Sequence, residues 1–296
     1  MTVRSACLLL PLLVGCAGAA PLPARALELN DAGARALAEG NLETADARLS
    51  LALEYSPHFV DALVNLGLVE CQRGNFTRAR QLLLRARRIN PDVAQPHHAL
   101  GVLAERERRP DRASEHYRDA LRVDPGFAPA RANLGRLEFD AGKLEAAYVT
   151  FKKLSEVAPE QPDGYVGLAE ALIRLDRVEE ALGITREASA RFPDDPGLAL
   201  LTARAELRAG RVEAGIALLL PLAAQHDDFA AAALGWLATA ELARGDARRA
   251  VGAAKRALSL DPEQPVAIRA LASALSQLDD PSAAAWAERS RQLSSP

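Results

Sequence analysis

Apolar residues along residues 60–93 recur at the spacing of two amphipathic helices. Gly74 separates the two segments and Pro91 follows the second, and a proline disfavours helical geometry in the residue before it. The pattern therefore predicts a helix–turn–helix unit whose second helix ends at Asn90. The apolar faces of the two helices are supplied by Leu63, Leu66, Leu83 and Leu84.

Small residues occupy fixed places in this unit. Gly67 lies in the first helix, and Ala79 and Ala86 lie in the second. Two helices approach closely only where one of them lacks bulk, so these residues predict a tight contact between the pair. Enlarging Gly67 or Ala79 should overpack that contact and destabilise the fold by about 1–3 kcal/mol.

The order of these residues resembles the tetratricopeptide repeat, a 34-residue helix–turn–helix unit that stacks into solenoids. Glu70 departs from the family pattern, in which that place is usually aromatic. The residues that match the pattern are Leu63, Leu66, Gly67, Gly74, Ala79, Leu83, Ala86 and Pro91.

The same period continues along the chain, because prolines recur 34 residues apart. The resemblance implies an all-α fold over residues 26–296, a right-handed superhelix of about seven repeats. A terminal capping helix pair is expected at 265–296. The prolines in register are Pro57, Pro91, Pro125, Pro159 and Pro193.

Residues 196–230 follow the repeat least well. Pro221 lies inside the expected second helix of this unit, where a kink is expected. Elsewhere, second helices are expected to begin at side chains that cap a helix, namely Asn41, Asn75 and Asp246.

The N-terminus has the pattern of a bacterial signal peptide at residues 1–15, with Arg4 ahead of a short apolar run. The run is too short to span a bilayer, which takes about 20 residues. Residues 13–16 (LVGC) resemble a lipobox, which implies cleavage before Cys16 and its lipidation. Residues 16–25 would then form a lipid-anchored linker. In the resembled lipoproteins the residue after the cysteine directs sorting, and Ala17 at that place favours the periplasmic side of the outer membrane over the inner membrane. Ordinary cleavage after Ala19, giving a soluble periplasmic protein, is the alternative.

Charge and motif content narrow the function further. The formal net charge of −3 argues against nucleic-acid binding, which usually requires a basic face. Cys7 would be removed with the signal peptide and Cys16 would be acylated, so Cys71 would be the one free thiol of the mature protein. We expect Cys71 to act as a small, partly buried hydrophobic residue. The five histidines form no metal-ligand pair, and nucleophile, Walker and Rossmann motifs are absent. We therefore predict no catalytic residue, metal site, cofactor or small-molecule substrate.

The resemblance implies that first helices line a concave groove, which binds an extended peptide or a partner helix. We expect asparagine amides there to pair with peptide backbone, and arginines to steer an acidic segment. An arginine-rich stretch at 85–112 is the alternative binding surface. The predicted groove residues are Asn65, His98, Asn133, Arg136, Phe139, Glu170, Arg174, Arg204, Arg208 and Trp236.

The predicted function is a non-enzymatic protein–protein interaction scaffold of the bacterial envelope. Lipoproteins of this build resemble factors that assist the assembly of type IV or Tad pili and their secretins. Scaffolds for exopolysaccharide export and adaptors for cell-wall hydrolases have the same build and remain alternatives. From a different class, an enzyme with its site in residues 196–230 is a remote alternative.

Overall fold

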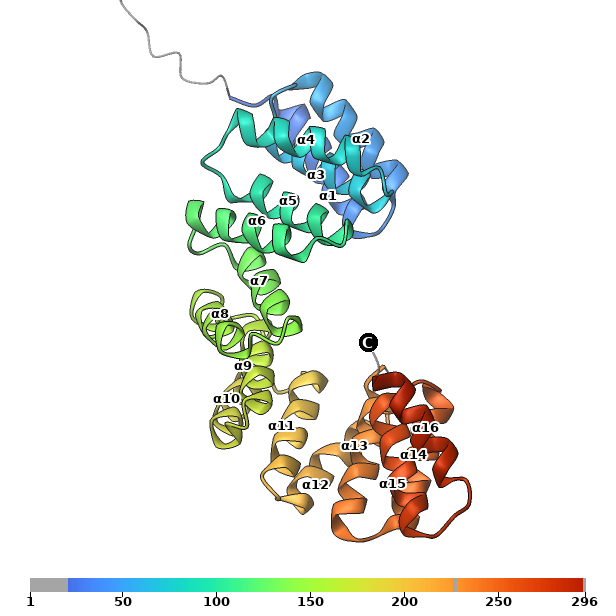
Figure 1. Ribbon diagram of the computed structural model, residues 1–296. Coiled ribbons are helices and arrows are strands. Elements are labelled where there is room, and N and C mark those ends of the chain that lie inside the picture. Colours follow the sequence, from blue (N-terminus) through green and yellow to red (C-terminus); the bar gives the residue numbers. More distant parts are fainter. Residues whose placement is uncertain (1–20, 226–227, 295–296) are drawn as a thin grey trace, which may run out of the picture. The chain divides into compact units, whose positions relative to one another are not determined.

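Figure 1 shows a computed structural model that describes residues 21–225 and 228–294. Every regular element in these ranges is an α-helix, which confirms the all-α prediction. The chain divides into two compact units, one ending at Arg109 and the other beginning at Pro110. Each unit is described by itself.

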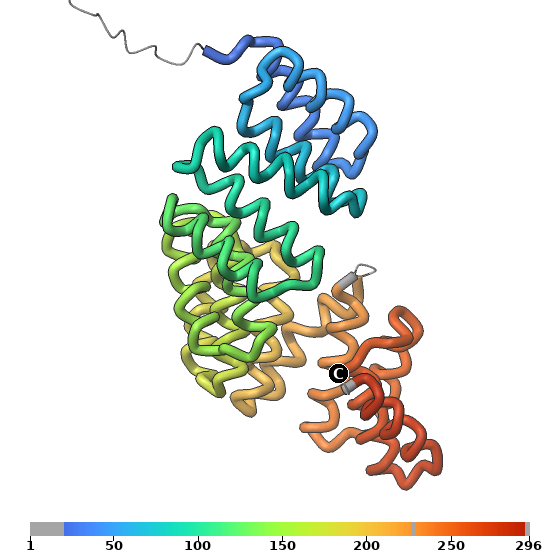
Figure 2. The backbone as a smooth tube through the Cα atoms, turned by 45° about the horizontal axis from the view of Figure 1, so that its top comes forward, coloured from blue at the N-terminus to red at the C-terminus, as the bar shows by residue number. Residues whose placement is uncertain are grey.

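The first unit pairs consecutive helices that run in opposite directions, as Figure 2 shows. Among its first helices, α1 contacts α3 and α3 contacts α5, so they form a layer beside the second helices. The elements are α1 (Ala24–Ala38), α2 (Leu42–Tyr55), α3 (Val60–Gln72), α4 (Phe76–Ile89) and α5 (Ala94–Arg106).

The second unit continues the same alternation. Counted along the described residues, its helices and those of the first unit correspond to seven repeats and a terminal pair, as predicted. The elements are α6 (Pro110–Val123), α7 (Ala128–Asp140), α8 (Leu144–Val157), α9 (Asp163–Arg174), α10 (Val178–Arg191), α11 (Pro196–Arg208), α12 (Val212–Ala223), α13 (Asp228–Arg244), α14 (Ala247–Leu260), α15 (Pro265–Gln277) and α16 (Ala283–Ser294).

Glycine allows the two helices of a repeat to pack closely, as the sequence predicted. A Cβ added at Gly67 would lie 2.6 Å from Cδ2 of Leu83, well inside the range of normal contacts. Gly135 meets Phe151 in the same way, at 2.8 Å. Leu83 and Ala79 are fully buried, so a larger residue at Gly67 has no room to relax.

The turn between the two helices of each repeat contains a residue with a positive φ angle, in the left-handed region of backbone conformation. Glycine supplies it in most repeats, for example Gly74 with φ of 81°. The same conformation occurs at three residues that, unlike glycine, carry a side chain: Arg108 (φ 60°), Asp176 (φ 61°) and Asp279 (φ 53°). The backbone of the turn is therefore kept where the glycine of the pattern is lost.

Two of the three predicted helix caps are present in the structure. Asn41 and Asp246 cap their helices, accepting from the N–H groups of Thr44 and Arg249. Asn75 occupies the capping position but makes no cap bond, and its amide donates to Glu70 at 2.7 Å instead. That prediction was wrong because a buried carboxylate lies beside the turn.

Helix α12 continues for two residues beyond Pro221.

Candidate functional site: side chains along the first helices

The eight predicted groove residues of the second unit lie on α7, α9, α11 and α13, and each of these helices contacts the next in the series. The 34-residue period places equivalent residues at equivalent heights, so side chains of neighbouring repeats meet. We call seven of them, all except Asn133, the charged ladder: Arg136, Phe139, Glu170, Arg174, Arg204, Arg208 and Trp236.

The first contact of the ladder joins α7 to α9. Cζ of Arg174 lies 5.2 Å from the centroid of the Phe139 ring, in cation–π contact. Phe139 is half-buried and Arg174 is exposed. The ring is thus held against the helix layer while the guanidinium group faces solvent.

The second contact joins three helices through one arginine. The Arg204 guanidinium pairs with both carboxylate oxygens of Glu170, one of them at 3.1 Å. The same group lies over the Trp236 ring, with Cζ 5.1 Å from its centroid. The side chains of Arg204 and Glu170 are 23% and 27% exposed, so the pair is screened less than a surface pair. This arrangement fixes the Trp236 ring beside a charged pair.

The remaining arginines of the ladder pair with acidic groups at its edge. Arg136 donates to Asp140 at 3.2 Å, and Arg208 donates to Asp176 at 3.1 Å. Much of the positive charge expected to steer an acidic segment is therefore balanced within the chain. An acidic partner would have to exchange with these carboxylates.

The predicted groove residues of the first unit are neutral. Nδ2 of Asn65 on α3 donates to Oδ1 of Asn30 on α1 at 3.0 Å, and Asn30 is buried. His98 on α5 is half-buried, and burial lowers its pKa to about 4, against a smaller opposing effect of Glu105. The imidazole is therefore uncharged at neutral pH.

Asn133, the second asparagine expected to bind peptide backbone, lies in the second unit. Its Nδ2 donates to the hydroxyl of Tyr117 at 3.2 Å, and Tyr117 is fully buried. Both predicted asparagines thus join neighbouring helices. An amide carries two donors and an acceptor, so a single bond of this kind does not exhaust its capacity.

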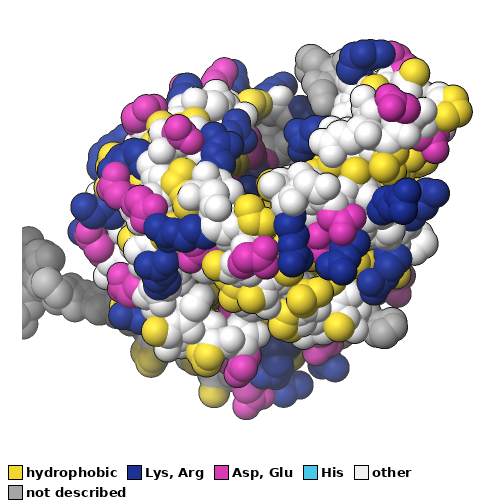
Figure 3. All heavy atoms as spheres, turned by 90° about the horizontal axis from the view of Figure 1, so that it is seen from below, with side chains coloured by type: hydrophobic (Ala, Val, Ile, Leu, Met, Phe, Trp, Pro, Cys, Tyr) yellow, Lys and Arg dark blue, Asp and Glu magenta, His cyan; other side chains and the backbone are white. Residues whose placement is uncertain are grey.

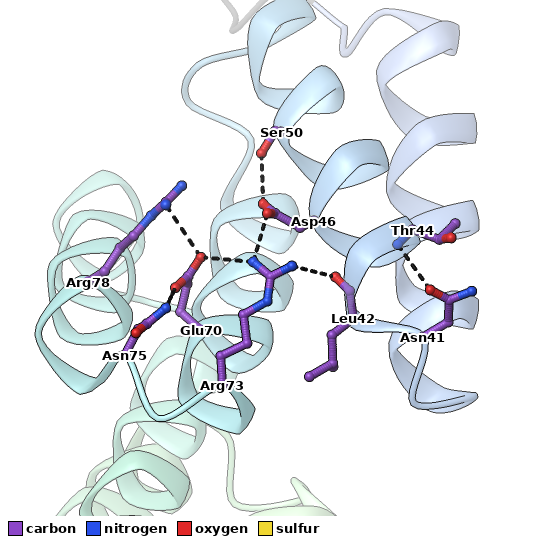
Figure 4. Close-up of polar contacts among 9 residues, drawn as sticks. All are labelled: Asn41, Leu42, Thr44, Asp46, Ser50, Glu70, Arg73, Asn75 and Arg78. Atoms are coloured by element: carbon purple, nitrogen blue, oxygen red, sulfur yellow. Dashed lines mark hydrogen bonds and ion pairs between the residues drawn. The ribbon is translucent and has the colours of Figure 1, made fainter.

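Sequence reasoning missed a set of buried glutamates near the ends of first helices. Glu70 is fully buried on α3, where Figure 4 shows Asn75, Arg73 and Arg78 converging on its carboxylate. Arg73 also bonds Asp46 of α2 at 2.7 Å, which links two repeats. The signal was present in the sequence, because Glu70 breaks the aromatic preference at its place in the repeat.

The second unit repeats this arrangement at Glu138 and Glu206. Glu138 pairs with Arg118 at 3.3 Å and accepts from Thr150 at 2.7 Å. Glu206 pairs with Arg186 and Arg211, both at 3.1 Å. Buried carboxylates need such partners to offset their lost hydration. These glutamates are therefore bonded between helices of the fold.

Other chemistry is sparse in the part of the chain that the structure describes. No cluster of metal-ligating side chains occurs there, and no helix is long and apolar enough to cross a membrane. Cys71 is buried, and burial raises the pKa of its thiol, in line with the predicted small hydrophobe. Cys16 lies outside the described residues. On the face drawn in Figure 3, basic and acidic side chains are intermixed.

Three family models, each described as tetratricopeptide repeat, match the chain. One matches residues 59–125, a second matches 104–164 and 138–196, and a third matches 200–265. Together they account for the repeats from the second to the seventh.

Two characterised proteins are similar in sequence. The type IV pilus assembly protein PilF of Pseudomonas aeruginosa is 32% identical over 123 residues, which are 41% of this chain and 49% of that protein. Cellulose synthase operon protein C of Pseudomonas fluorescens is 26% identical over 166 residues, 52% of this chain and 13% of that protein. The chain thus matches about half of the first relative and a small part of the second.

Solved structures that share the fold include those of PilF and PilW. The structure of Pseudomonas aeruginosa PilF has a TM-score of 0.58 at 25% identity, covering 69% of this chain and 92% of that one. PilW, described as a widely conserved type IV pilus biogenesis factor, has a TM-score of 0.60 at 18% identity and covers 72% of this chain and 99% of that one. At that identity the likeness to PilW concerns the fold alone.

Proposed function

Because the chain belongs to the tetratricopeptide repeat family, we propose that it is a non-enzymatic scaffold that binds protein partners during assembly of a type IV or Tad pilus. The observation that carries this proposal is the similarity to PilF, which holds in sequence and in fold. The partner would be a subunit of the envelope machine, such as its secretin.

The charged ladder suggests how such a partner binds. Trp236 and Phe139 are half-buried rings, and large aromatic side chains at a surface are frequent binding hot spots. Arg204 and Arg208 already bond carboxylates, so an acidic partner side chain would replace an existing contact with an equivalent one. Binding would then be selective for acidic segments and sensitive to salt.

A gene deletion in a piliated host tests the pathway. We expect loss of surface pili, restored by the wild-type gene and only weakly by one encoding Arg204→Glu with Trp236→Ala. The matched control is Gly252→Leu, at an exposed helical site where an added Cβ meets no atom within 4 Å. Normal piliation in the deletion strain would contradict the pilus assignment.

The membrane anchor is a separate part of the proposal. We propose that Cys16 is lipidated and holds the chain at the periplasmic side of the outer membrane. Cys16→Ser should move the protein from the membrane fraction to the soluble periplasmic fraction. A mature wild-type protein that begins at Ala20 by mass spectrometry would favour the soluble alternative.

Exopolysaccharide export is the second candidate function, favoured by the similarity to cellulose synthase operon protein C. The deletion strain discriminates between the two candidates. Loss of secreted polysaccharide with normal pili would favour export, and loss of pili alone would favour the first proposal. Changed cell-wall hydrolysis with both intact would indicate an adaptor for hydrolases.

A further inference from the structure

The second unit contains a pocket of about 440 Å³ that the proposed groove does not use. Its base is formed by Leu168 and Leu172 of α9, which are 3% and 1% exposed. Glu170 and Arg174 of the same helix lie two residues further along, about 200° around the helix axis. The pocket therefore opens on the side of α9 that is opposite the charged ladder.

The walls of the pocket come from the second helices on either side. Tyr148 and Lys152 of α8 face Gly183 and Ile184 of α10 across it. A volume of this size is typical of ligand pockets and would hold more than one side chain.

Gly183 leaves open space at one wall of the pocket. A Cβ added there would meet no atom within 4 Å, whereas one added at Gly67 or Gly135 would clash. Its φ is not in the left-handed region either. Gly183 is exposed, as is Gly252 on α14, so a side chain can be added at either site without a clash.

The charged side chains that line the pocket are mostly acidic. Three carboxylates, Glu156, Glu180 and Glu187, line it with one ammonium group, that of Lys152. Hydrogen bonds from Lys153 and Arg177 lower the pKa of Glu156 and Glu180, respectively, so both are ionised at neutral pH.

Each carboxylate is paired with a basic group of the chain, namely Lys153, Arg177 and Arg191. Arg177 and Arg191 also lie over the rings of Tyr148 and Tyr165, which line the pocket. A cationic partner group would therefore share these carboxylates or exchange with the arginines.

We propose that this pocket is a second docking site, which binds a partner segment carrying a large apolar side chain next to lysine or arginine. The apolar base accepts the side chain, and the carboxylates at the rim accept hydrogen bonds from the cation. The site is independent of the charged ladder, whose arginines favour an acidic segment. One chain could therefore hold two partner segments of opposite charge on the two sides of its helix layer.

A random 12-residue peptide library displayed on phage tests this directly, selected on the wild-type protein after depletion on Gly183→Leu. The leucine would occupy the open space and favour the helix, so the fold should be kept or stabilised. We expect enriched peptides that combine leucine or an aromatic residue with lysine or arginine. Failure to enrich any peptide, or enrichment of acidic ones, would overturn the proposal.

Fluorescence anisotropy with an enriched peptide supplies the quantitative comparison. Gly183→Leu should weaken binding about tenfold or more, because it displaces one buried apolar side chain. The matched control is Gly252→Leu, which is also the sixth residue of its helix and has equal space around it, and should leave affinity unchanged. Equal losses in the two variants would contradict a pocket at Gly183.

Charge variants complete the test and separate it from the groove. Glu156→Gln combined with Glu187→Gln should weaken binding several-fold and reduce its salt dependence. Arg204→Gln should leave peptide binding unchanged, because Arg204 belongs to the charged ladder. Loss of peptide binding in Arg204→Gln would show that the selected peptides occupy the groove, and the pocket assignment would fail while the groove proposal stood.

Discussion

The predicted groove residues differ in kind between the two units. Those of the first unit are neutral, with Asn65 bonded to buried Asn30 and His98 uncharged at neutral pH. Apart from Asn133, those of the second unit are charged or aromatic, centred on Arg204 between Glu170 and Trp236. One repeat pattern thus supports two surfaces, one that should respond to pH and one that should respond to salt.

The largest expected effect concerns His98. Burial lowers its pKa from 6.5 to about 4 in the folded protein, so between these values the unfolded chain binds a proton that the folded chain does not. Stability should therefore fall as the pH decreases through this window, by about 3 kcal/mol in total from this group.

Urea unfolding followed by circular dichroism at several pH values measures this contribution. His98→Gln should remove the corresponding part of the pH dependence, whereas His58→Gln, at an exposed residue, should not. An unchanged pH profile in His98→Gln would mean that the histidine is solvated in the folded state.

A smaller effect is expected for the asparagine pair of the first unit. Asn65→Ala removes the donor to Oδ1 of Asn30, which is 8% exposed, and should cost about 1–3 kcal/mol. The loss should be the same at low and high salt because neither group is charged. Replacing both asparagines by leucine should recover most of the stability, and failure to do so would indicate additional partners.

The smallest effect is expected at the edge of the charged ladder. Arg208 and Asp176 are 53% and 77% exposed, so Arg208→Ala should change the free energy of unfolding by less than about 0.5 kcal/mol. Even this difference should vanish in concentrated salt. A loss as large as that of Asn65→Ala would remove the distinction between the neutral and the charged surface.

The fold could be predicted from the sequence because each repeat carries its own local signals. Gly67 facing Leu83 and the left-handed turn at Gly74 are set by backbone and packing within a single repeat. The 34-residue register predicted that Phe139, Arg174, Arg204 and Trp236 share one face. The contacts of Phe139 with Arg174 and of Arg204 with Trp236 were found only in the structure.

What could not be predicted depends on contacts between elements. Glu70 and Glu206 look like solvated charges in the sequence, yet they are buried because arginines of nearby turns and helices reach them. Asn75 is drawn from its capping role by Glu70 in the same way. The pocket beside Gly183 is formed by residues of three helices, and no sequence motif records such a combination.

The proposed function requires that the charged ladder is the surface that binds the partner. Isothermal titration of the protein with the pilus secretin subunit of the same bacterium, at about 0.05 and 0.3 M salt, tests this most directly. We expect affinity to fall with salt and to drop about tenfold or more in Trp236→Ala and in Arg204→Glu. Asn65→Ala should change it much less. Binding that is independent of salt and unaffected by either ladder variant would contradict the account.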